Sequence, residues 1–281
     1  MSESSEKTVL ITGTSTGIGA ACVDALRAEG WHVLAGRRDG SHGGASSEGV
    51  TTIELDVTSE PSIAAAAARV RELTDGRLDA LVNNAGIPGA GPVETVPIDE
   101  FRATIETNLI GQFAVTQAFL PQIRASKGRI VFMSSLGGRV AFPYASPYHA
   151  SKWGLEALAE SLRAEMAPLE VAVSLIEPAS MKTEIWEKGR ASLDEARARM
   201  TDEQRSLYGE ALAGFDDQLA SQEDSEEPAK VAEKVVEALT SSSPSERYLV
   251  GQGARTLTLL KPLVPDSLFD RLSQRLASGG S

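Results

Sequence analysis

The sequence predicts an α/β fold in which a doubly wound parallel sheet of about seven strands carries helices on both faces. Short runs that are apolar throughout alternate along the chain with longer segments of 3.6-residue periodicity. Strands without polar alternation belong to a parallel sheet that helices cover on both sides. The chain has 281 residues and no internal repeat, so we expect residues 1–281 to form a single domain.

Four strands and two helices are expected in the first part of the chain. The apolar runs at residues 8–12, 31–36, 51–55 and 78–83 predict the strands. A helix should follow the glycine-rich turn after the first strand and continue to about residue 29, and an alanine-rich helix should cover residues 59–74. Residues 39–49 are rich in glycine and serine, which predicts a surface loop in place of a helix.

The same alternation continues to the end of the sheet. Helices are expected at residues 99–124, 146–166 and 228–240, and strands at 129–134, 171–177 and 247–251. Residues 181–227 contain few aromatic residues among many charges, which predicts a helical lid above the carboxyl ends of the strands. Residues 252–281 are expected to be a C-terminal tail. Within it an apolar stripe at helical spacing is more typical of a core or subunit contact than of a membrane anchor; its members are Leu268, Phe269, Leu272 and Leu276.

Composition excludes several classes of function. The net charge of −12 provides no basic surface for nucleic acid and would repel an anionic membrane. No apolar run is long enough to span a bilayer, and the polar first residues do not resemble a signal peptide. Cys22 is the only cysteine and the three histidines are scattered, so we expect neither a disulfide nor a metal site. These observations favour a soluble cytoplasmic protein.

A glycine-rich turn joins the first strand to the first helix. The run TGTSTGIG places Gly13, Gly17 and Gly19 where a tight turn, a close approach to phosphate and close helix packing are needed. The helix that follows directs free N–H groups and a positive dipole end toward an anion. This arrangement predicts a Rossmann-type dinucleotide site, although a glycine turn without a ligand is the alternative.

The end of the second strand indicates which dinucleotide is preferred. A site for NAD usually places a carboxylate there to bind the ribose hydroxyls. This chain has Arg37 and Arg38 instead, and two guanidinium groups match a 2′-phosphate in charge and geometry. NADP(H) is therefore favoured over NAD(H), while a solvated arginine pair remains the simpler alternative.

Tyr148 and Lys152 lie four residues apart at the start of a predicted helix and so share one face. Ser146 and Pro147 are expected to begin that helix as N-cap and first residue. A free phenol has a pKa of about 10. A neighbouring ammonium and the helix dipole should lower the pKa of Tyr148 and make it a proton donor and acceptor near pH 7.

Polar residues at two strand ends give this pair a context. The fifth predicted strand ends in Ser134 and Ser135, and ligands bind at the carboxyl ends of parallel strands. Either hydroxyl could donate to a substrate oxygen. The run NNAG at 83–86 ends the fourth strand, and Asn108 interrupts a helix in which asparagine is a poor helix former.

Together these motifs resemble the short-chain dehydrogenase/reductase family. The resemblance rests on TGTSTGIG, NNAG, Asn108, the paired serines and the run YHASK, and it covers residues 8–183. It implies that Tyr148 transfers the proton and that Lys152 lowers its pKa and holds the nicotinamide ribose. The family's spacing selects Ser135 over Ser134 as the catalytic serine. Asn108 would hold the helix geometry and a water that links Lys152 to solvent.

The resemblance also implies a set of cofactor contacts. Asp56 would contact the adenine, Asn84 the adenosine side, and Thr183 the nicotinamide amide. The full cofactor set comprises Gly13, Ser15, Gly17, Ile18, Gly19, Arg37, Arg38, Asp56, Asn84, Tyr148, Lys152 and Thr183. One residue departs from the family pattern, because Ala179 follows Pro178 where a glycine is common.

The favoured function is an NADP(H)-dependent oxidoreductase that interconverts a ketone or aldehyde with an alcohol. The alternatives are an NADP(H)-binding regulatory protein, which should lack Tyr148 or Lys152, and a nucleotide-sugar epimerase or dehydratase, which should need a longer C-terminal region. An apolar pocket would favour a bulky hydrophobic, steroid- or retinoid-like substrate. Its expected lining is Ile87, Pro88, Leu136, Val140, Phe142, Tyr144, Met181 and Trp186. We expect a homodimer or homotetramer that pairs through the helices carrying Asn108 and Tyr148.

Overall fold

The structure is a computed structural model that describes residues 6–38, 48–221 and 225–277. Seven parallel strands form one sheet in the order β3-β2-β1-β4-β5-β6-β7. The strand order reverses between β1 and β4, and ligands bind at such a reversal beside the carboxyl strand ends. The predicted doubly wound parallel sheet is therefore confirmed.

The strands lie close to the positions that their apolar runs predict. Their bounds are β1 Thr8–Thr12, β2 His32–Arg37, β3 Val50–Glu54, β4 Ala80–Asn83, β5 Arg129–Met133, β6 Ala172–Pro178 and β7 Arg247–Val250. The strand β4 begins two residues later than predicted. Its preceding residue, Asp79, accepts a hydrogen bond from the backbone N–H of Thr8 with its carboxylate at 2.9 Å, which links the two strands before the ladder begins.

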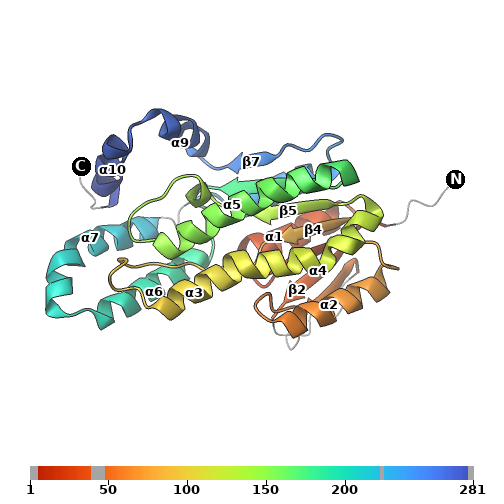
Figure 1. The fold of residues 1–281 in the computed structure, drawn as a ribbon, viewed down its shortest axis with the longest axis horizontal. Coiled ribbons are helices and arrows are strands. Elements are labelled where there is room, and N and C mark those ends of the chain that lie inside the picture. The colour runs from red at the N-terminus through yellow and green to blue at the C-terminus, as the bar shows by residue number, and fades with distance from the viewer. Residues whose placement is uncertain (1–5, 39–47, 222–224, 278–281) are drawn as a thin grey trace.

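Helices cover the sheet on both faces (Figure 1). One face is covered by α2 Glu60–Leu73, α4 Gly111–Ser126 and α5 Ser146–Met166, and the other by α1 Gly17–Ala28 and α8 Ala229–Thr240. Each face has its own apolar cluster, in which Phe119 and Phe132 are fully buried on the first and Cys22 is fully buried on the second. Burial raises the pKa of the Cys22 thiol to about 12. Cys22 is therefore a packing residue.

The long helix predicted at 99–124 is present but its backbone changes midway. It consists of α3 Ile98–Ile105, one π-helical turn at Glu106–Ile110, and α4. Such turns occur often at functional sites because they redirect side chains. Here the turn contains Asn108, which is fully buried, so the interruption that the asparagine suggests in the sequence is a real one.

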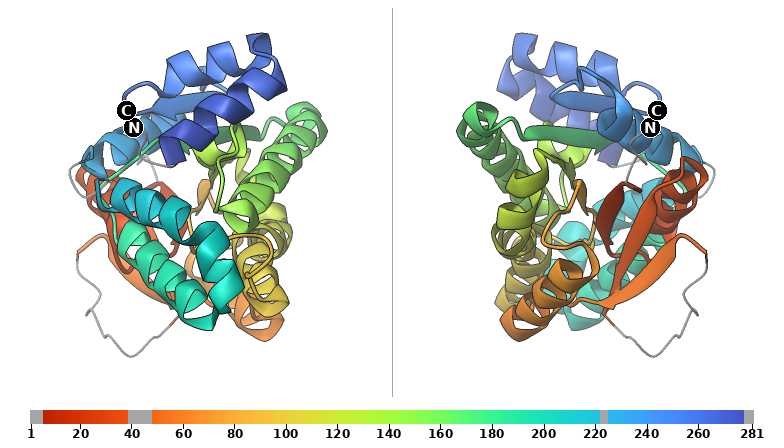
Figure 2. Two further views of the ribbon diagram at one scale, coloured as in Figure 1. Left: turned by 90° about the vertical axis from the view of Figure 1, so that its left-hand side faces the viewer. Right: turned by 90° about the vertical axis from the view of Figure 1, so that its right-hand side faces the viewer.

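Two helices follow β6 in the segment predicted to be helical. They are α6 Ile185–Arg199 and α7 Asp202–Ser221, and they lie at one end of the molecule (Figure 1). Figure 2 shows them crossing the front of that end in its left view. Their inner sides form a third apolar cluster around Leu193, Leu212 and Phe215. A parallel bridge between Met181 and Glu226 joins the two ends of this segment.

The C-terminal region is more regular than a tail. It contains α9 Ala254–Leu260 and α10 Asp266–Ala277. Phe269 on α10 is buried against Phe142, with ring centroids 6.3 Å apart, whereas Leu268 is half exposed. The expected apolar stripe is thus a core contact at Phe269. The predicted loop at 39–49 lies largely outside the described residues.

Candidate active site

The turn between β1 and α1 has the backbone that a phosphate site requires. Gly13 has a φ of +68°, which side chains rarely tolerate. A Cβ on Gly19 would lie 2.1 Å from the carbonyl oxygen of Gly13, so α1 can approach the turn this closely only with glycine there. The N–H groups of the first turn of α1 are thereby placed beside the groove described next, where an anion would be stabilised.

A groove runs from this turn over the carboxyl ends of the strands. It has an empty volume of about 1040 Å³, part of which is open to solvent. The structure brings ten of the predicted cofactor residues to its wall: Gly13, Ser15, Gly17, Ile18, Gly19, Arg37, Arg38, Asp56, Asn84 and Thr183. These come from the ends of β1, β2, β3, β4 and β6, which is the arrangement expected for a dinucleotide laid across the sheet.

Arg37 and Arg38 lie at the end of the groove where β2 finishes. Arg37 is the last residue of β2, and its Nε donates to the Thr14 hydroxyl at 3.3 Å, which directs the guanidinium along the groove wall. Arg38 is exposed and close enough to Asp56 for its charge to help lower the pKa of that carboxyl. Hydrogen bonds from Thr58 to Asp56 are the larger cause of this lowering.

Asn84 performs a structural task that the sequence did not reveal. Its side-chain nitrogen donates to the carbonyl oxygens of Thr12 and Gly13, both at 2.9 Å. Its backbone N–H donates to the Thr12 hydroxyl. The amide therefore fixes the phosphate turn against the end of β4, whatever contact it makes with a cofactor.

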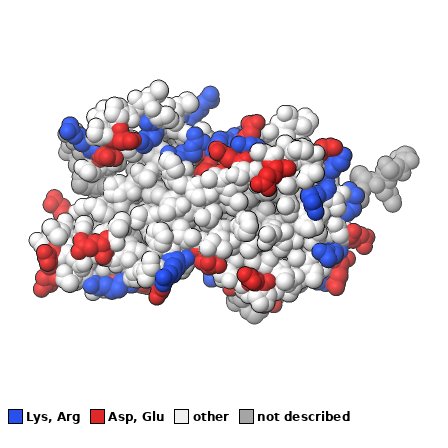
Figure 3. All heavy atoms as spheres, in the orientation of Figure 1, with Lys and Arg blue, Asp and Glu red and all other residues white. Residues whose placement is uncertain are grey.

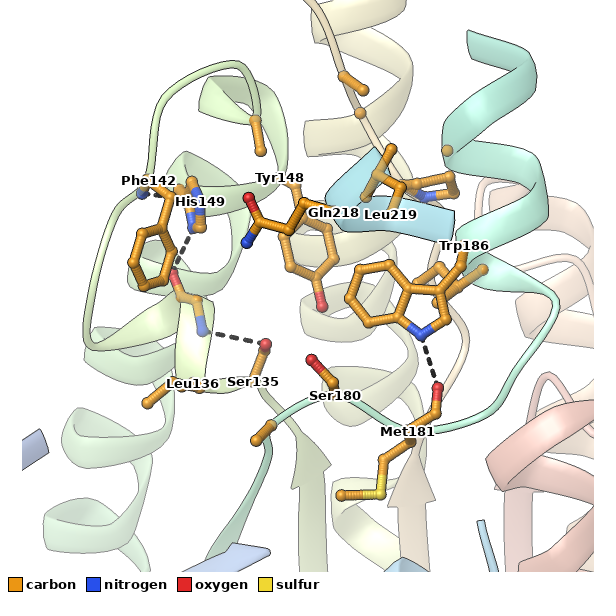
Figure 4. A pocket seen from close by; sticks show the side chains of 18 of the residues that line it. Ser135, Leu136, Phe142, Tyr148, His149, Ser180, Met181, Trp186, Gln218 and Leu219 are labelled. Carbon is orange, nitrogen blue, oxygen red and sulfur yellow. Dashed lines mark hydrogen bonds between the residues drawn. The ribbon is translucent and has the colours of Figure 1, made fainter. Parts of the chain in front are cut away.

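Ser135 and Tyr148 meet where the groove opens into a second hollow (Figure 4). Ser135 follows the end of β5, and its hydroxyl accepts from the Gly137 N–H at 3.0 Å. Tyr148 projects from the first turn of α5, and its side chain lies in the wall of the same hollow. Ser134 instead points into the core and donates to Glu156. Of the two serines, Ser135 therefore faces the hollow that contains Tyr148.

Lys152 lies one helical turn further along α5. Its Nζ donates to the backbone carbonyl of Met133 at 2.7 Å and lies 5.7 Å from the centre of the Tyr148 ring. A Cβ built on Gly86 of the NNAG turn would be 3.8 Å from Nζ, so the ammonium faces the small-residue end of β4. Lys152 is buried and lines neither the groove nor the second hollow.

Asn108 connects the NNAG turn to α5. Its side-chain oxygen accepts from the Ile87 N–H at 2.8 Å, and its nitrogen donates to the Ile87 carbonyl and to the Ser151 hydroxyl. A solvent-facing polar role for Asn108 is excluded by its complete burial. The π-helical turn therefore holds the loop after β4 in position against the helix that carries Tyr148 and Lys152.

The predicted lowering of the Tyr148 pKa is wrong for this structure. Burial raises the pKa of Tyr148, and the nearby Ser135 side chain offsets only part of that rise. Burial also lowers the pKa of Lys152 to about 8, against an opposing effect from the charge of Glu156. The spacing of the two residues places them on one face but does not indicate how completely both are removed from water, and desolvation disfavours each charged form.

The α5 helix also begins differently from the prediction. Ala145 is the N-cap and has no side-chain capping bond, so Ser146 is the first helical residue. The backbone N–H of His149 reaches the Ala145 carbonyl at 3.0 Å and closes the first turn. Tyr148 therefore lies within the first turn, where the dipole end of the helix is near.

The second hollow is the candidate substrate pocket (Figure 4). It has an empty volume of about 1050 Å³, part of which is open to solvent, and Ser135 and Tyr148 form part of its wall. Five of the predicted lining residues are present there: Pro88, Leu136, Phe142, Met181 and Trp186. Three predictions are wrong. Ile87 faces the nucleotide groove, Val140 is buried in the interior, and Tyr144 packs on Phe215 behind the wall.

Several wall residues were not identified in the sequence. Phe215, Gln218 and Leu219 reach the pocket from α7, about seventy positions after Tyr148, so no local pattern connects them to it. His149 is also in the wall. It accepts the Phe142 N–H at Nε2, and its Nδ1 lies 2.9 Å from the Gly137 carbonyl, so a neutral ring satisfies both contacts. Burial lowers the pKa of His149 accordingly.

The lid begins against both hollows. Ala179 is the residue that departs from the family pattern, and it lies in the wall of the pocket. Its backbone N–H donates to the Val250 carbonyl at 2.8 Å, which joins the end of β6 to β7. The Thr183 side chain would be 3.4 Å from a Cβ on Gly17. The Thr16 hydroxyl donates to the Glu184 carboxylate at 3.2 Å, which ties the lid to the phosphate turn.

Among residues 6–38, 48–221 and 225–277, no group of histidine, cysteine and acidic side chains is arranged to hold a metal ion. No helix in the part of the chain that the structure describes is long and apolar enough to cross a membrane.

Comparison with known proteins agrees with this geometry. The family model described as short chain dehydrogenase matches residues 7–194. Human retinol dehydrogenase 16 is 35% identical over 278 residues, which cover 95% of this chain and 87% of the relative. The NADPH-dependent 3-dehydrocapnine reductase of Ornithobacterium rhinotracheale is 32% identical over 274 residues, covering 94% of each chain.

A solved structure is similar over nearly the whole chain. The short-chain dehydrogenase from Streptomyces avermitilis superposes with a TM-score of 0.73 at 30% identity, covering 98% of this chain and 97% of that one. Sequence motifs, sheet order and the placement of Ser135, Tyr148 and Lys152 thus lead to one conclusion. The chain belongs to the short-chain dehydrogenase/reductase family.

Proposed function

We propose that this protein is an NADP(H)-dependent oxidoreductase that interconverts a carbonyl compound and an alcohol, with Asn108, Ser135, Tyr148 and Lys152 as its catalytic residues. The observation that carries the proposal is the meeting of Ser135 and Tyr148 in the wall of an apolar pocket, beside a nucleotide groove that shares part of that wall. A carbonyl oxygen bound between these two hydroxyls would lie next to a nicotinamide held in the groove.

The fit of the groove to a dinucleotide can be judged from this chain alone. The glycine turn leaves room for phosphate, and the guanidinium groups of Arg37 and Arg38 lie where an adenosine 2′-phosphate would end. No carboxylate among the described residues that line the groove replaces them at the end of β2. NADPH dependence of the 3-dehydrocapnine reductase supports the same preference. The cofactor would supply or accept the hydride.

The chain's own groups would manage the proton and the oxygen. Ser135 would donate a hydrogen bond to the carbonyl oxygen, because its hydroxyl proton has only a long contact of 3.5 Å to the Pro178 carbonyl. Tyr148 would donate the proton to the same oxygen as it becomes an alkoxide. Lys152 would replace that proton through its ammonium, and Asn108 would hold the backbone that surrounds it.

The substrate that the pocket favours is bulky and hydrophobic. Its wall is largely apolar, and the helical lid at 181–227 contributes Trp186, Phe215 and Leu219. A steroid- or retinoid-like carbonyl would fill such a space, and retinol is the substrate named for the human relative. The chemistry that binds such a molecule is apolar contact along its length with two hydrogen bonds at the reacting oxygen.

A regulatory protein that binds NADP(H) without turnover remains the alternative function, but no observation favours it. Tyr148 and Ser135 are both in place, and a binding protein has no need of them. Single-domain organisation and a cytoplasmic location stay predictions.

A homodimer or homotetramer is supported by the face of α4 and α5, where Figure 3 shows uncharged atoms across the centre and where Phe113 and Trp153 are half exposed.

Oxidation of NADPH in the presence of ketones and aldehydes of increasing size tests the function directly. We expect turnover to improve as the apolar part of the substrate grows, because each added buried CH₂ contributes about 0.8 kcal/mol of binding. The measurement is the loss of NADPH absorbance with each compound, with NADH as the parallel cofactor. Binding of NADPH without oxidation of any compound would instead support the regulatory alternative.

The pH dependence of reduction should report Lys152. At pH 7 the raised pKa of Tyr148 and the Lys152 pKa of about 8 leave both groups protonated. Ketone reduction requires these protonated forms, because the carbonyl oxygen takes up a proton. The rate constant kcat for ketone reduction should therefore fall as the pH rises through about 8, and alcohol oxidation should become faster over the same range. A reduction rate that is constant from pH 7 to 9.5 would exclude Lys152 as the proton source.

A further inference from the structure

A row of three side chains on α5 faces three consecutive residues at the end of β5. Tyr148 lies beside Ser135 in the pocket wall, Lys152 donates to the Met133 carbonyl, and the third member, Glu156, accepts from Ser134. Positions 148, 152 and 156 follow one another at four-residue spacing and so lie along one face of the helix. The first two are catalytic in the proposed function, but the third has no part in it.

Glu156 is a carboxylate in the interior of the protein. Its side chain is 8% exposed, and burying a charge is costly unless it is paired. Its partner is Arg247, the first residue of β7, which also contacts Glu177 of β6 and Glu160 of α5. A strand more than ninety residues along the chain therefore supplies the cation that keeps this carboxylate in place.

Glu156 belongs to a network of charged side chains from α5, β6 and β7. Around it lie Glu160 on its own helix, Glu177 on β6, Arg247 on β7, and Arg139, which is 3.5 Å from Glu177. Glu177 is fully buried, and burial together with the charge of Glu156 raises its pKa. One of its oxygens has no hydrogen-bond partner. The network thus joins three carboxylates to two guanidinium groups.

Lys152 lies on the other side of Glu156, one helical turn away. It is buried, and its hydrogen bond to Met133 is to a neutral carbonyl. The charge of Glu156 opposes the effect of burial on the Lys152 pKa. Without a neighbouring anion, the amine would lose its proton more readily still, because burial disfavours the ammonium form.

We propose that Glu156, paired with Arg247, is a positioning residue for the reaction: it fixes the strand end that carries Ser135 and keeps the Lys152 amine charged. This inference rests on the proposed function for the roles of Ser135 and Lys152. The inference also gives β7 a part in catalysis, although Arg247 does not line the pocket. The guanidinium of Arg247 partly neutralises the Glu156 carboxylate and so determines how strongly that carboxylate stabilises the Lys152 ammonium.

The test is a titration of Lys152 that needs no substrate. The protein is prepared with ¹³C-labelled lysine, and the Lys152 side-chain signal, assigned from Lys152→Arg, is followed by NMR as the pH is raised. Glu156→Gln should lower the Lys152 midpoint by about one pH unit, the lower end of what a neighbouring charge produces. Glu160→Gln is the matched control, because it removes an exposed carboxylate from the same Arg247, one turn further from Lys152. It should leave the midpoint unchanged.

A second variant protects the test against loss of folding. Arg247→Gln removes the competing cation while Glu156 remains, and it should raise the Lys152 midpoint. Loosened packing would not produce shifts of opposite sign in the two variants. An unchanged midpoint in Glu156→Gln, an equal shift in Glu160→Gln, or a lowered midpoint in Arg247→Gln would each overturn the proposal.

Turnover provides the second readout. With any ketone that the wild-type protein reduces, the high-pH fall of kcat should move in Glu156→Gln to lower pH by the same amount as the Lys152 midpoint. A decrease of kcat that is uniform across pH would assign Glu156 to structure alone and contradict the proposal. If the wild-type protein reduces no compound, the proposed function fails, whereas the lysine titration still decides the role of Glu156.

Discussion

Replacing Tyr148 with phenylalanine should lower kcat for ketone reduction by about 1000-fold, within the range of 10²–10⁴ that a general acid contributes. The ring is retained, so its packing beside His149 is preserved and only the hydroxyl at the pocket wall is lost. NADPH binding, measured by fluorescence titration, should stay within about fivefold of wild type, since one hydrogen bond contributes about 1 kcal/mol.

The matched control for this variant is Tyr144→Phe. Tyr144 packs on Phe215 behind the pocket, and its hydroxyl has no part in the proposed chemistry. It should reduce ketones at nearly the wild-type rate. If Tyr148→Phe retained more than about a tenth of the wild-type kcat, the proton would have to come from another group and the proposed mechanism would be wrong.

The second large effect is expected from the double variant in which Arg37 and Arg38 are both changed to alanine. Hydrogen bonds to charged groups contribute about 1.5–3 kcal/mol each. The exposure of Arg38 places its contribution at the lower end, so the pair should contribute about 3 kcal/mol to NADPH binding. The Kd for NADPH should therefore rise about 100-fold, while the Kd for NADH, which has no 2′-phosphate, should rise only a few-fold.

Raising the salt concentration is an independent check on this assignment. NADPH binding to wild type should weaken with added salt more steeply than NADH binding, because an arginine–phosphate contact at a partly exposed site is screened. The double variant should lose that difference. Equal weakening of NADPH and NADH in the double variant would show that the two arginines contact a part of the cofactor common to both.

Most of the fold could be predicted from the chain because its central strands are apolar on both faces. The runs at 8–12 and 129–134 have no other stable environment than a covered sheet, and β1 and β5 are found there. In the C-terminal region the helical spacing of the apolar stripe at 268–276 agrees with α10, whereas α9 was not predicted. Their order comes from tertiary contacts such as that between Phe269 and Phe142.

The site was predictable where its residues lie within motifs and unpredictable where it depends on burial. Gly19, Ser135 and Tyr148 are identified by spacing, and the structure places them beside the two hollows. Spacing does not reveal desolvation, so the direction of the Tyr148 pKa shift was wrong. Gln218 and Arg247 were not identified because tertiary packing alone brings α7 and β7 to this end of the sheet.

The wall common to the two hollows limits how this enzyme can be redesigned. Pro88, Thr183 and Ile185 border both the groove and the pocket, so any change there would disturb coenzyme affinity together with selectivity. Phe215, Gln218 and Leu219 border the pocket alone. A mutant library aimed at new ketones would therefore be best confined to α7, where substitutions reshape the pocket and leave the coenzyme groove unchanged.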